Sequence, residues 1–192
     1  VATKPEAPLL CRDLPDNIAA YETLGNQHEL EEIFSNAHHV TRMELTNNRL
    51  VGTPLEPRGL NCYIDPEDGT LILHASHQSA TRLHGFLCSI FKLQPEQLRV
   101  KVGDLGGGFG TKVAVYPEDI LVVYAAKKLK VPIKWTATRT QEFQASVHSR
   151  DHMNIAELAC DPKGRILALR VKTLANTGAY LTNPALLIPL GL

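Results

Sequence analysis

Residues 70–136 alternate short apolar segments with amphipathic ones, and this alternation restricts the possible folds more than any other feature of the sequence. The patterns predict, in chain order, a strand at 70–76, a helix at 79–93, a strand at 98–102, a helix at 117–130 and a strand at 131–136. Strands separated by helices are joined most simply in a parallel sheet with the helices packed on it. We therefore expect a β-α-β-α-β unit in the middle of the chain.

The residues before this unit predict antiparallel pairing. Strands are expected at 40–51 and 59–64, and the turn Asp65-Pro-Glu-Asp-Gly69 leads into the strand at 70–76. These three strands would form an antiparallel meander, preceded by a short helix at 28–37. The expected fold class is thus α+β (mixed α/β), with the meander joined to the β-α-β-α-β unit in two layers.

The two ends of the chain differ in character from its middle. Residues 1–15 contain three prolines and are expected to form an extended lead-in. Beyond the unit, we expect a short helix at 139–145 and then a hairpin of strands at 154–160 and 165–174. The last segment, 181–192, is apolar and interrupted by proline, and it is expected to be the cut edge of a larger structure.

Composition and charge disfavour several classes of protein. The 192 residues include 20 Lys and Arg against 20 Asp and Glu, and a net charge of zero argues against a nucleic-acid-binding protein. No apolar run approaches the ~18 residues that a membrane-spanning helix needs, and Lys4 and Glu6 stand where a signal peptide would be apolar. The four cysteines form no CxxC pair and fit a reducing compartment, so we expect a cytoplasmic location.

The histidines do not match a metal site. His74 and His77 are three residues apart at a strand end, where that spacing does not place both on one face. His148 and His152 lack the Glu of an HExxH motif between them. We therefore expect surface and turn histidines, and no direct metal ligand in the chain.

The strongest local motif is the glycine-rich run Gly103-Asp-Leu-Gly-Gly-Gly-Phe-Gly-Thr-Lys112, which holds five glycines in its first eight residues. It follows a predicted strand and precedes a predicted helix, where free backbone N–H groups favour an anion. Its spacing matches neither a Walker A loop nor a Rossmann fingerprint. Two interpretations stay open, an anion or phosphate site and a permissive turn that lets two elements pack. Phe109 among the glycines favours a ring that packs on a flat ligand or fills a cavity.

A second strand-to-helix junction lies at Ser76-His-Gln-Ser79. Successive strand ends share one edge of a parallel sheet, so Gln78 and the Gly106–Gly110 loop should open toward the same crevice. The alternative is that Gln78 lies in the first turn of its helix and faces water, while Ser79 or Ser76 caps that helix.

Together these segments resemble one family. The chain is similar to the molybdenum hydroxylases, which comprise xanthine dehydrogenase, aldehyde oxidase and aerobic carbon monoxide dehydrogenase. The resemblance covers nearly the whole chain and rests on the segments Asn47–Val51, Pro54–Gly59, Gly106–Lys112 with Gln78 placed 31 residues before Phe109, His148–His152 and Leu174–Tyr180.

The resemblance implies a large subunit that binds molybdenum on molybdopterin, in bacteria usually as the cytosine dinucleotide. Partner subunits or domains would carry [2Fe-2S] clusters and FAD. The substrate would be a small molecule, namely an aldehyde, an N-heteroaromatic compound or carbon monoxide, oxidised with water as the oxygen source. Residues 16–192 would be the first part of the molybdopterin-binding domain, and we expect such a fragment, which starts at Val1 instead of Met, to be inactive alone.

The same resemblance assigns roles to residues of the loop. Gln78 would hydrogen-bond an oxo ligand of the metal from the second shell, and Phe109 and Gly110 would present backbone N–H groups to metal-bound or pterin oxygens. The neighbouring glycines that complete the cofactor-binding set and allow this approach are Gly106, Gly107 and Gly108. No catalytic residue is expected in the chain.

One departure from the family pattern limits the range of expected substrates. Purine-oxidising members carry a Glu directly after the loop Lys, where this chain has Val113, so a purine substrate is disfavoured. Two alternatives to the enzyme hypothesis remain open. One is a non-catalytic anion- or nucleotide-binding α/β module, and the other is a structural domain whose glycines serve packing alone.

Overall fold

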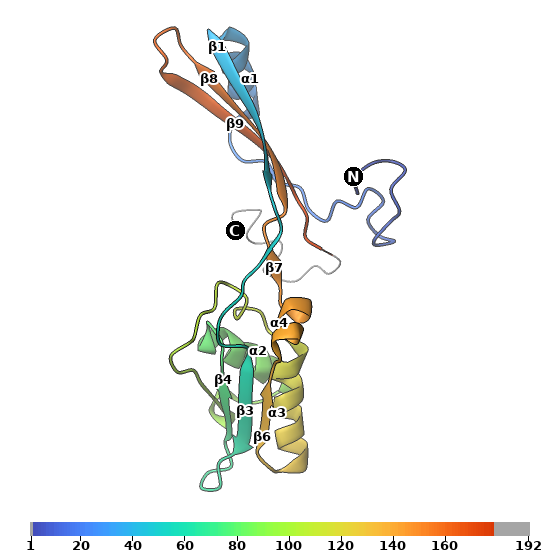
Figure 1. The fold of residues 1–192 in the computed structure, drawn as a ribbon, viewed down its shortest axis with the longest axis vertical. Coiled ribbons are helices and arrows are strands. Elements are labelled where there is room, and N and C mark those ends of the chain that lie inside the picture. Colours follow the sequence, from blue (N-terminus) through green and yellow to red (C-terminus); the bar gives the residue numbers. More distant parts are fainter. Residues whose placement is uncertain (1, 179–192) are drawn as a thin grey trace. The chain divides into compact units, whose positions relative to one another are not determined.

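The computed structural model describes residues 2–178, which form two compact units (Figure 1). The central unit comprises Leu50–Ser149, and the other combines the residues before and after it. The predicted edge at 181–192 lies outside the described residues. No helix within residues 2–178 is long and apolar enough to cross a membrane.

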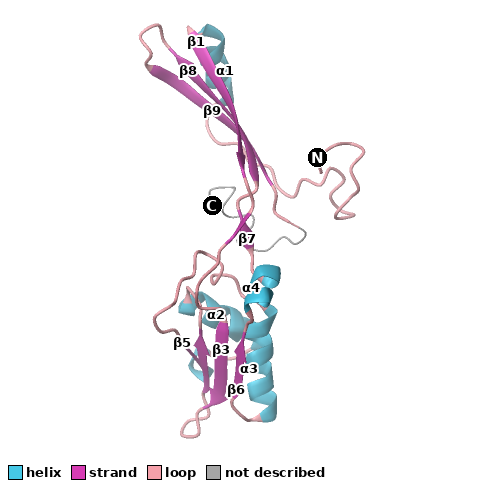
Figure 2. Cartoon of the chain, in the orientation of Figure 1, coloured by secondary structure: helices cyan, strands magenta, loops and turns pink. Residues whose placement is uncertain are grey.

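The central unit is built on a four-stranded sheet with the order β5-β4-β3-β6 (Figure 2). Its strands are β3 (Gly59–Ile64), β4 (Leu71–Ala75), β5 (Leu98–Lys101) and β6 (Ile133–Thr136). β4 and β5 are parallel, whereas β3 runs antiparallel to both of its neighbours, β4 and β6. Strands β4, β5 and β6 thus point the same way, with β3 inserted between β4 and β6.

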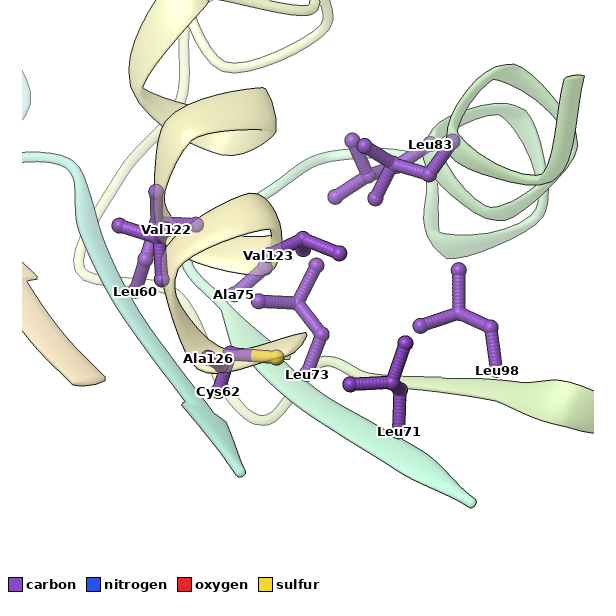
Figure 3. Packing of buried hydrophobic residues seen from close by; sticks show 11 residues of the cluster. Leu60, Cys62, Leu71, Leu73, Ala75, Leu83, Leu98, Val122, Val123 and Ala126 are labelled. Carbon is purple, nitrogen blue, oxygen red and sulfur yellow. The ribbon is translucent and has the colours of Figure 1, made fainter. Parts of the chain in front are cut away.

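Two helices cover one face of this sheet, α2 (Ala80–Phe91) and α3 (Pro117–Leu129). The pairing Cys62–Leu73 and its neighbours place alternate residues of each strand on that face. The buried core is made of sheet residues Leu60, Cys62, Leu71, Leu73, Ala75 and Leu98 with helix residues Leu83, Leu87, Val122, Val123 and Ala126 (Figure 3). Each fully buried leucine contributes roughly 2 kcal/mol of transfer free energy. The apolar residues of the strands and helices therefore fix both helices on the sheet.

Local signals set the ends of these helices. Ser79 caps α2, because its hydroxyl accepts a hydrogen bond from the Arg82 amide. Pro117 opens α3, and the Asp119 carboxylate accepts from the Tyr116 amide just before it. A short helix, η1 (Pro95–Gln97), leads into β5, and α4 (Arg139–Ala145) follows β6. The central unit also contains the small ladder of β2 (Leu50–Val51) and β7 (His148–Ser149).

The other unit contains α1 (Gln27–Asn36) and an antiparallel sheet of β1 (His39–Asn47), β8 (His152–Cys160) and β9 (Ile166–Ala175). Helix α1 contacts β9, where Arg170 pairs with Glu31 and lies over the Phe34 ring. The opposite face of the sheet carries apolar side chains of β1 and β9 that are about half exposed within the described chain, namely Met43, Leu45, Leu169 and Val171.

The predicted α+β class and its two layers are confirmed, but one strand pairing was wrong. The strand expected at 40–51 is split into β1 and β2, and β1 pairs along its whole length with β8 instead of joining β3. The proline-containing segment between β2 and β3 separates the two sheets, since Pro54 and Pro57 cannot continue a ladder. The meander is therefore reduced to β3 and β4. The third strand of the β-α-β-α-β unit, β6, points the same way as β4 and β5 but is separated from β4 by the antiparallel β3.

Candidate functional site

The glycine-rich loop between β5 and α3 meets the β4–α2 junction. The backbone N–H of Gln78 donates to the Lys112 carbonyl at 2.8 Å. In return, Gln78 Oε1 accepts from the backbone N–H of Gly110 at 3.0 Å and from that of Lys112 at 3.2 Å. The sheet topology thus brings together the two segments that the sequence predicted at one edge.

The alternative placement of Gln78 was wrong in one respect: the helix begins at Ala80, so Gln78 precedes its first turn. The expected exposure of Gln78 and the Ser79 cap agree with the structure. Because two backbone N–H groups point at Oε1, the orientation of the Gln78 side-chain amide is determined by its surroundings. Its Nε2 donates to no group among residues 2–178, and Gln78 is exposed.

Two glycines are required here by close approach. A Cβ atom on Gly108 would lie 2.4 Å from Gln78 Cδ, and one on Gly106 would lie 2.6 Å from Glu56 Cβ. Both distances are far below van der Waals contact, so any larger residue would displace the neighbour. At Gly106 a side chain would collide with Glu56 close to its backbone, whereas at Gly108 it would push aside the flexible end of the Gln78 side chain.

The middle of the loop presents unsatisfied donors. Within the described chain, the backbone N–H groups of Gly107, Gly108 and Phe109 have no acceptor. Phe109 has a left-handed backbone, with φ of 50°, and its side chain is 74% exposed. Consecutive amides in such a turn form a concave donor surface for anionic or strongly polar oxygens.

An ion pair at the base of the loop was not predicted from the sequence. Lys112 Nζ lies 2.9 Å from Glu56 Oε2, and the Lys112 side chain is completely buried. The same Glu56 oxygen accepts from the Gly106 amide at 2.9 Å. The hydrogen bond from Lys112 is the main reason that the pKa of Glu56 is lowered, so the carboxylate is held in its charged form. No local pattern could reveal a pair so distant in the sequence.

A second set of polar contacts anchors the end of the loop. Tyr116 Oη donates to the Thr111 carbonyl at 2.6 Å, and Thr111 Oγ1 donates to the Gly108 carbonyl at 2.9 Å. The Tyr116 ring in turn lies under the buried Arg58 guanidinium, 3.7 Å from its Cζ. The loop is therefore connected to the interior through Tyr116.

Arg58 itself belongs to a buried ion pair. Its Nε lies 2.9 Å from Glu142 Oε1, and its Nη1 lies 3.4 Å from the partly exposed Glu118 carboxylate. This pair ties α4 to the segment before β3. It lies outside the glycine-rich loop and serves to hold the elements around it.

One histidine differs from its prediction. His77 is buried, not a surface residue, and its Nδ1 accepts from the Ser79 amide at 3.0 Å. Burial lowers the pKa of His77 and favours its neutral form. His74 stacks on Tyr63 on the sheet. Within residues 2–178, no three His, Cys, Asp or Glu side chains gather as a metal site would require.

Comparisons with known proteins agree on one family. Residues 11–191 match the model described as the molybdopterin cofactor-binding domain. The chain is 35% identical over 153 residues to the 6-hydroxypseudooxynicotine dehydrogenase complex subunit gamma of Paenarthrobacter nicotinovorans, which covers 79% of this chain and 19% of that relative. It is 28% identical over 191 residues to the carbon monoxide dehydrogenase large chain of Hydrogenophaga pseudoflava, covering 93% and 24%.

A solved structure gives the same result. The fold matches the reconstituted CO dehydrogenase from Oligotropha carboxidovorans with a TM-score of 0.80 and 30% sequence identity. The match covers 91% of this chain and 23% of that one. The chain thus spans no more than a quarter of the length of the relatives named here.

Proposed function

The chain belongs to the family of molybdopterin cofactor-binding domains, and from this we propose that Gln78 and the Gly106–Gly110 loop are its cofactor-contacting edge. The observation that carries the proposal is that, among residues 2–178, the backbone N–H groups of Gly107, Gly108 and Phe109 and the Nε2 of Gln78 have no acceptor, while Gln78 Oε1 is bonded to the same loop. A molybdenum–pterin centre is anionic and rich in oxygen, and uncharged donors match it. The residues present therefore fit the cofactor.

Within this proposal each residue has one task. Gln78 would hydrogen-bond the cofactor through Nε2, because its Oε1 already accepts from two backbone amides. Phe109, Gly107 and Gly108 would present their backbone N–H groups to the cofactor. The Gly110 N–H, which was also expected to face the cofactor, instead donates to Gln78 Oε1 and orients that side chain. Gly106 would provide clearance. When bound, the cofactor supplies the redox chemistry, while the protein supplies binding and polarisation.

The proposed activity is that of a molybdenum hydroxylase. We infer an oxidoreductase that oxidises an aldehyde, an N-heteroaromatic compound or carbon monoxide, with water as the oxygen source. Val113, where purine-oxidising members carry Glu, argues against a purine. The pterin would be the cytosine dinucleotide, and cytoplasmic partner subunits with [2Fe-2S] clusters and FAD would take the electrons. The relatives' names, a complex subunit and a large chain, support an assembly of several subunits.

Elemental analysis tests the proposal. The gene that encodes this chain would be expressed whole with its neighbouring subunits, and molybdenum per protein would be measured. We expect near-stoichiometric metal in the wild type and a loss of about tenfold for Gln78→Ala, the size typical of residues that orient a metal centre. Gln144→Ala, an exposed glutamine of α4, is the matched control. Wild-type protein without molybdenum, but with tight phosphate binding, would favour the anion-binding module instead.

A further inference from the structure

The most unusual group outside the proposed contact set is the buried ammonium of Lys112. Its side chain is fully buried, and among the described residues Glu56 is the acceptor that it meets. Removing a charge from water is costly unless it is paired, so the fold must retain Glu56 opposite Lys112. The buried Lys112 therefore holds its end of the glycine-rich loop beside Glu56.

The carboxylate of Glu56 joins both ends of the loop. Its Oε2 accepts from the Gly106 backbone amide, before the three unpaired amides, and from Lys112 Nζ, after them. The Glu56 backbone N–H also donates to the Gly106 carbonyl at 3.1 Å. The residues between these two points span the unpaired amides of Gly107, Gly108 and Phe109. One side chain thus closes the segment that carries the donors.

The ion pair is also coupled to Gln78 through the backbone of Lys112. The Lys112 N–H donates to Gln78 Oε1, and its carbonyl accepts from the Gln78 amide. A shift of the Lys112 backbone would remove one of the two N–H donors that orient Oε1 and would leave only the Gly110 N–H. The direction of Gln78 Nε2 therefore depends in part on the position of Lys112.

Resting on the proposed function, we propose that Glu56 and Lys112 are positioning residues for the cofactor. They hold the ends of the glycine-rich loop together, so that its free amides and Gln78 Nε2 face the same molecule. Neither residue touches the cofactor in this arrangement. Loss of the pair should loosen the loop and lower cofactor retention while the core of the central unit stays folded.

The experiment uses the whole protein, expressed with its subunits, and two readouts. Hydrogen–deuterium exchange followed by mass spectrometry reports on the peptide that contains Gly106, Gly110 and Lys112, and elemental analysis reports molybdenum. For Glu56→Gln we expect about tenfold faster exchange in this peptide, as a locally opened segment shows. Molybdenum should fall about tenfold, the usual effect of losing an outer support of a metal centre.

Two further variants keep the test decisive. The double variant Glu56→Gln with Lys112→Met leaves no buried unpaired charge and should fold, yet we expect it to lose molybdenum as well. Asp68→Asn breaks the exposed pair with Arg99 in the same unit and should match the wild type in both readouts.

The outcomes separate this inference from the function on which it rests. Wild-type exchange or full molybdenum content in Glu56→Gln overturns the positioning role, and so does a double variant with restored metal. Faster exchange that extends to the β4 peptide would show that the pair stabilises the whole unit, and this result would also overturn the positioning role. A wild type without molybdenum refutes the proposed function alone, because the exchange experiment still reports whether the pair holds the loop.

Discussion

At the scale of single residues, the site depends on a few close contacts between a glycine and a neighbouring side chain. Gly108 lies against Gln78, while Gly103, in the same loop, has no atom within 4 Å of the place where its Cβ would stand. The glycines of the loop are thus not equivalent. Sequence alone could find the run of glycines, but it could not tell the crowded position from the open one.

Gly108→Ala should affect the cofactor more than stability. The new Cβ would push away the flexible end of Gln78, so the free energy of unfolding should change by only about 1 kcal/mol. The displaced Gln78 would lose its two backbone donors, and molybdenum in the whole protein should decrease. Gly103→Ala is the control and should retain metal. Equal metal content in the two variants would leave the glycines with a packing role alone.

Asp119 makes stability depend on pH. Burial raises the pKa of Asp119 to about 6 from an ordinary value of 3.8. The folded chain therefore keeps a proton that the unfolded chain releases, and the free energy of unfolding falls as pH rises from about 4 to about 6. Asp119→Asn should remove this dependence and be more stable at pH 7 by roughly 1–3 kcal/mol. Urea denaturation across this range measures it, and identical pH profiles would contradict the assignment.

At the scale of elements, local signals and long-range contacts separate clearly. The helix at 139–145 could be predicted because Thr138 caps it and exchanges hydrogen bonds with Gln141. The pairing of β1 with β8 could not, since these strands are separated by the whole central unit and alternation does not name a partner. The same reason hid the role of Glu56, whose partner lies in another motif. The positions of strands and helices could be predicted from local sequence, whereas the elements that pair or pack with them could not.

Helix α4 should depend on its buried ion pair. Glu142→Gln leaves the Arg58 guanidinium buried without its charged partner and should lower the free energy of unfolding by about 3 kcal/mol. Glu118→Gln, at the longer and partly exposed contact, should cost less than about 1 kcal/mol. The double change Arg58→Met with Glu142→Leu should recover part of the loss. Chemical denaturation of the chain measures all three, and a larger cost for Glu118→Gln would reverse this ranking.

At the scale of the whole molecule, the chain covers 19–24% of the length of the relatives. In our proposal it therefore contributes one edge of the cofactor site, with uncharged donors. The family could be identified from sequence because its motifs are dense around Gln78 and the loop. The cofactor's remaining contacts are not among these 192 residues in our proposal.

The 192-residue chain alone should therefore not retain a pterin. The amides of the loop offer hydrogen bonds from one side only, and exposed hydrogen bonds contribute about 1 kcal/mol each. Pterin released on denaturation can be measured by its fluorescence after oxidation. Stoichiometric pterin on the isolated chain would contradict this expectation, and the whole protein expressed with its subunits is the positive control.

The burial of Lys112 has a consequence for chemical modification. Amine-reactive reagents need an accessible lysine that can lose its proton, because the neutral amine is the nucleophile, and the lysines at the end of α3, Lys127 and Lys128, are exposed. Lys112 can be acylated only in those moments when the loop lifts away from Glu56. The rate at which this single lysine acquires a label therefore measures, in solution and without any cofactor, how often the donor surface comes apart.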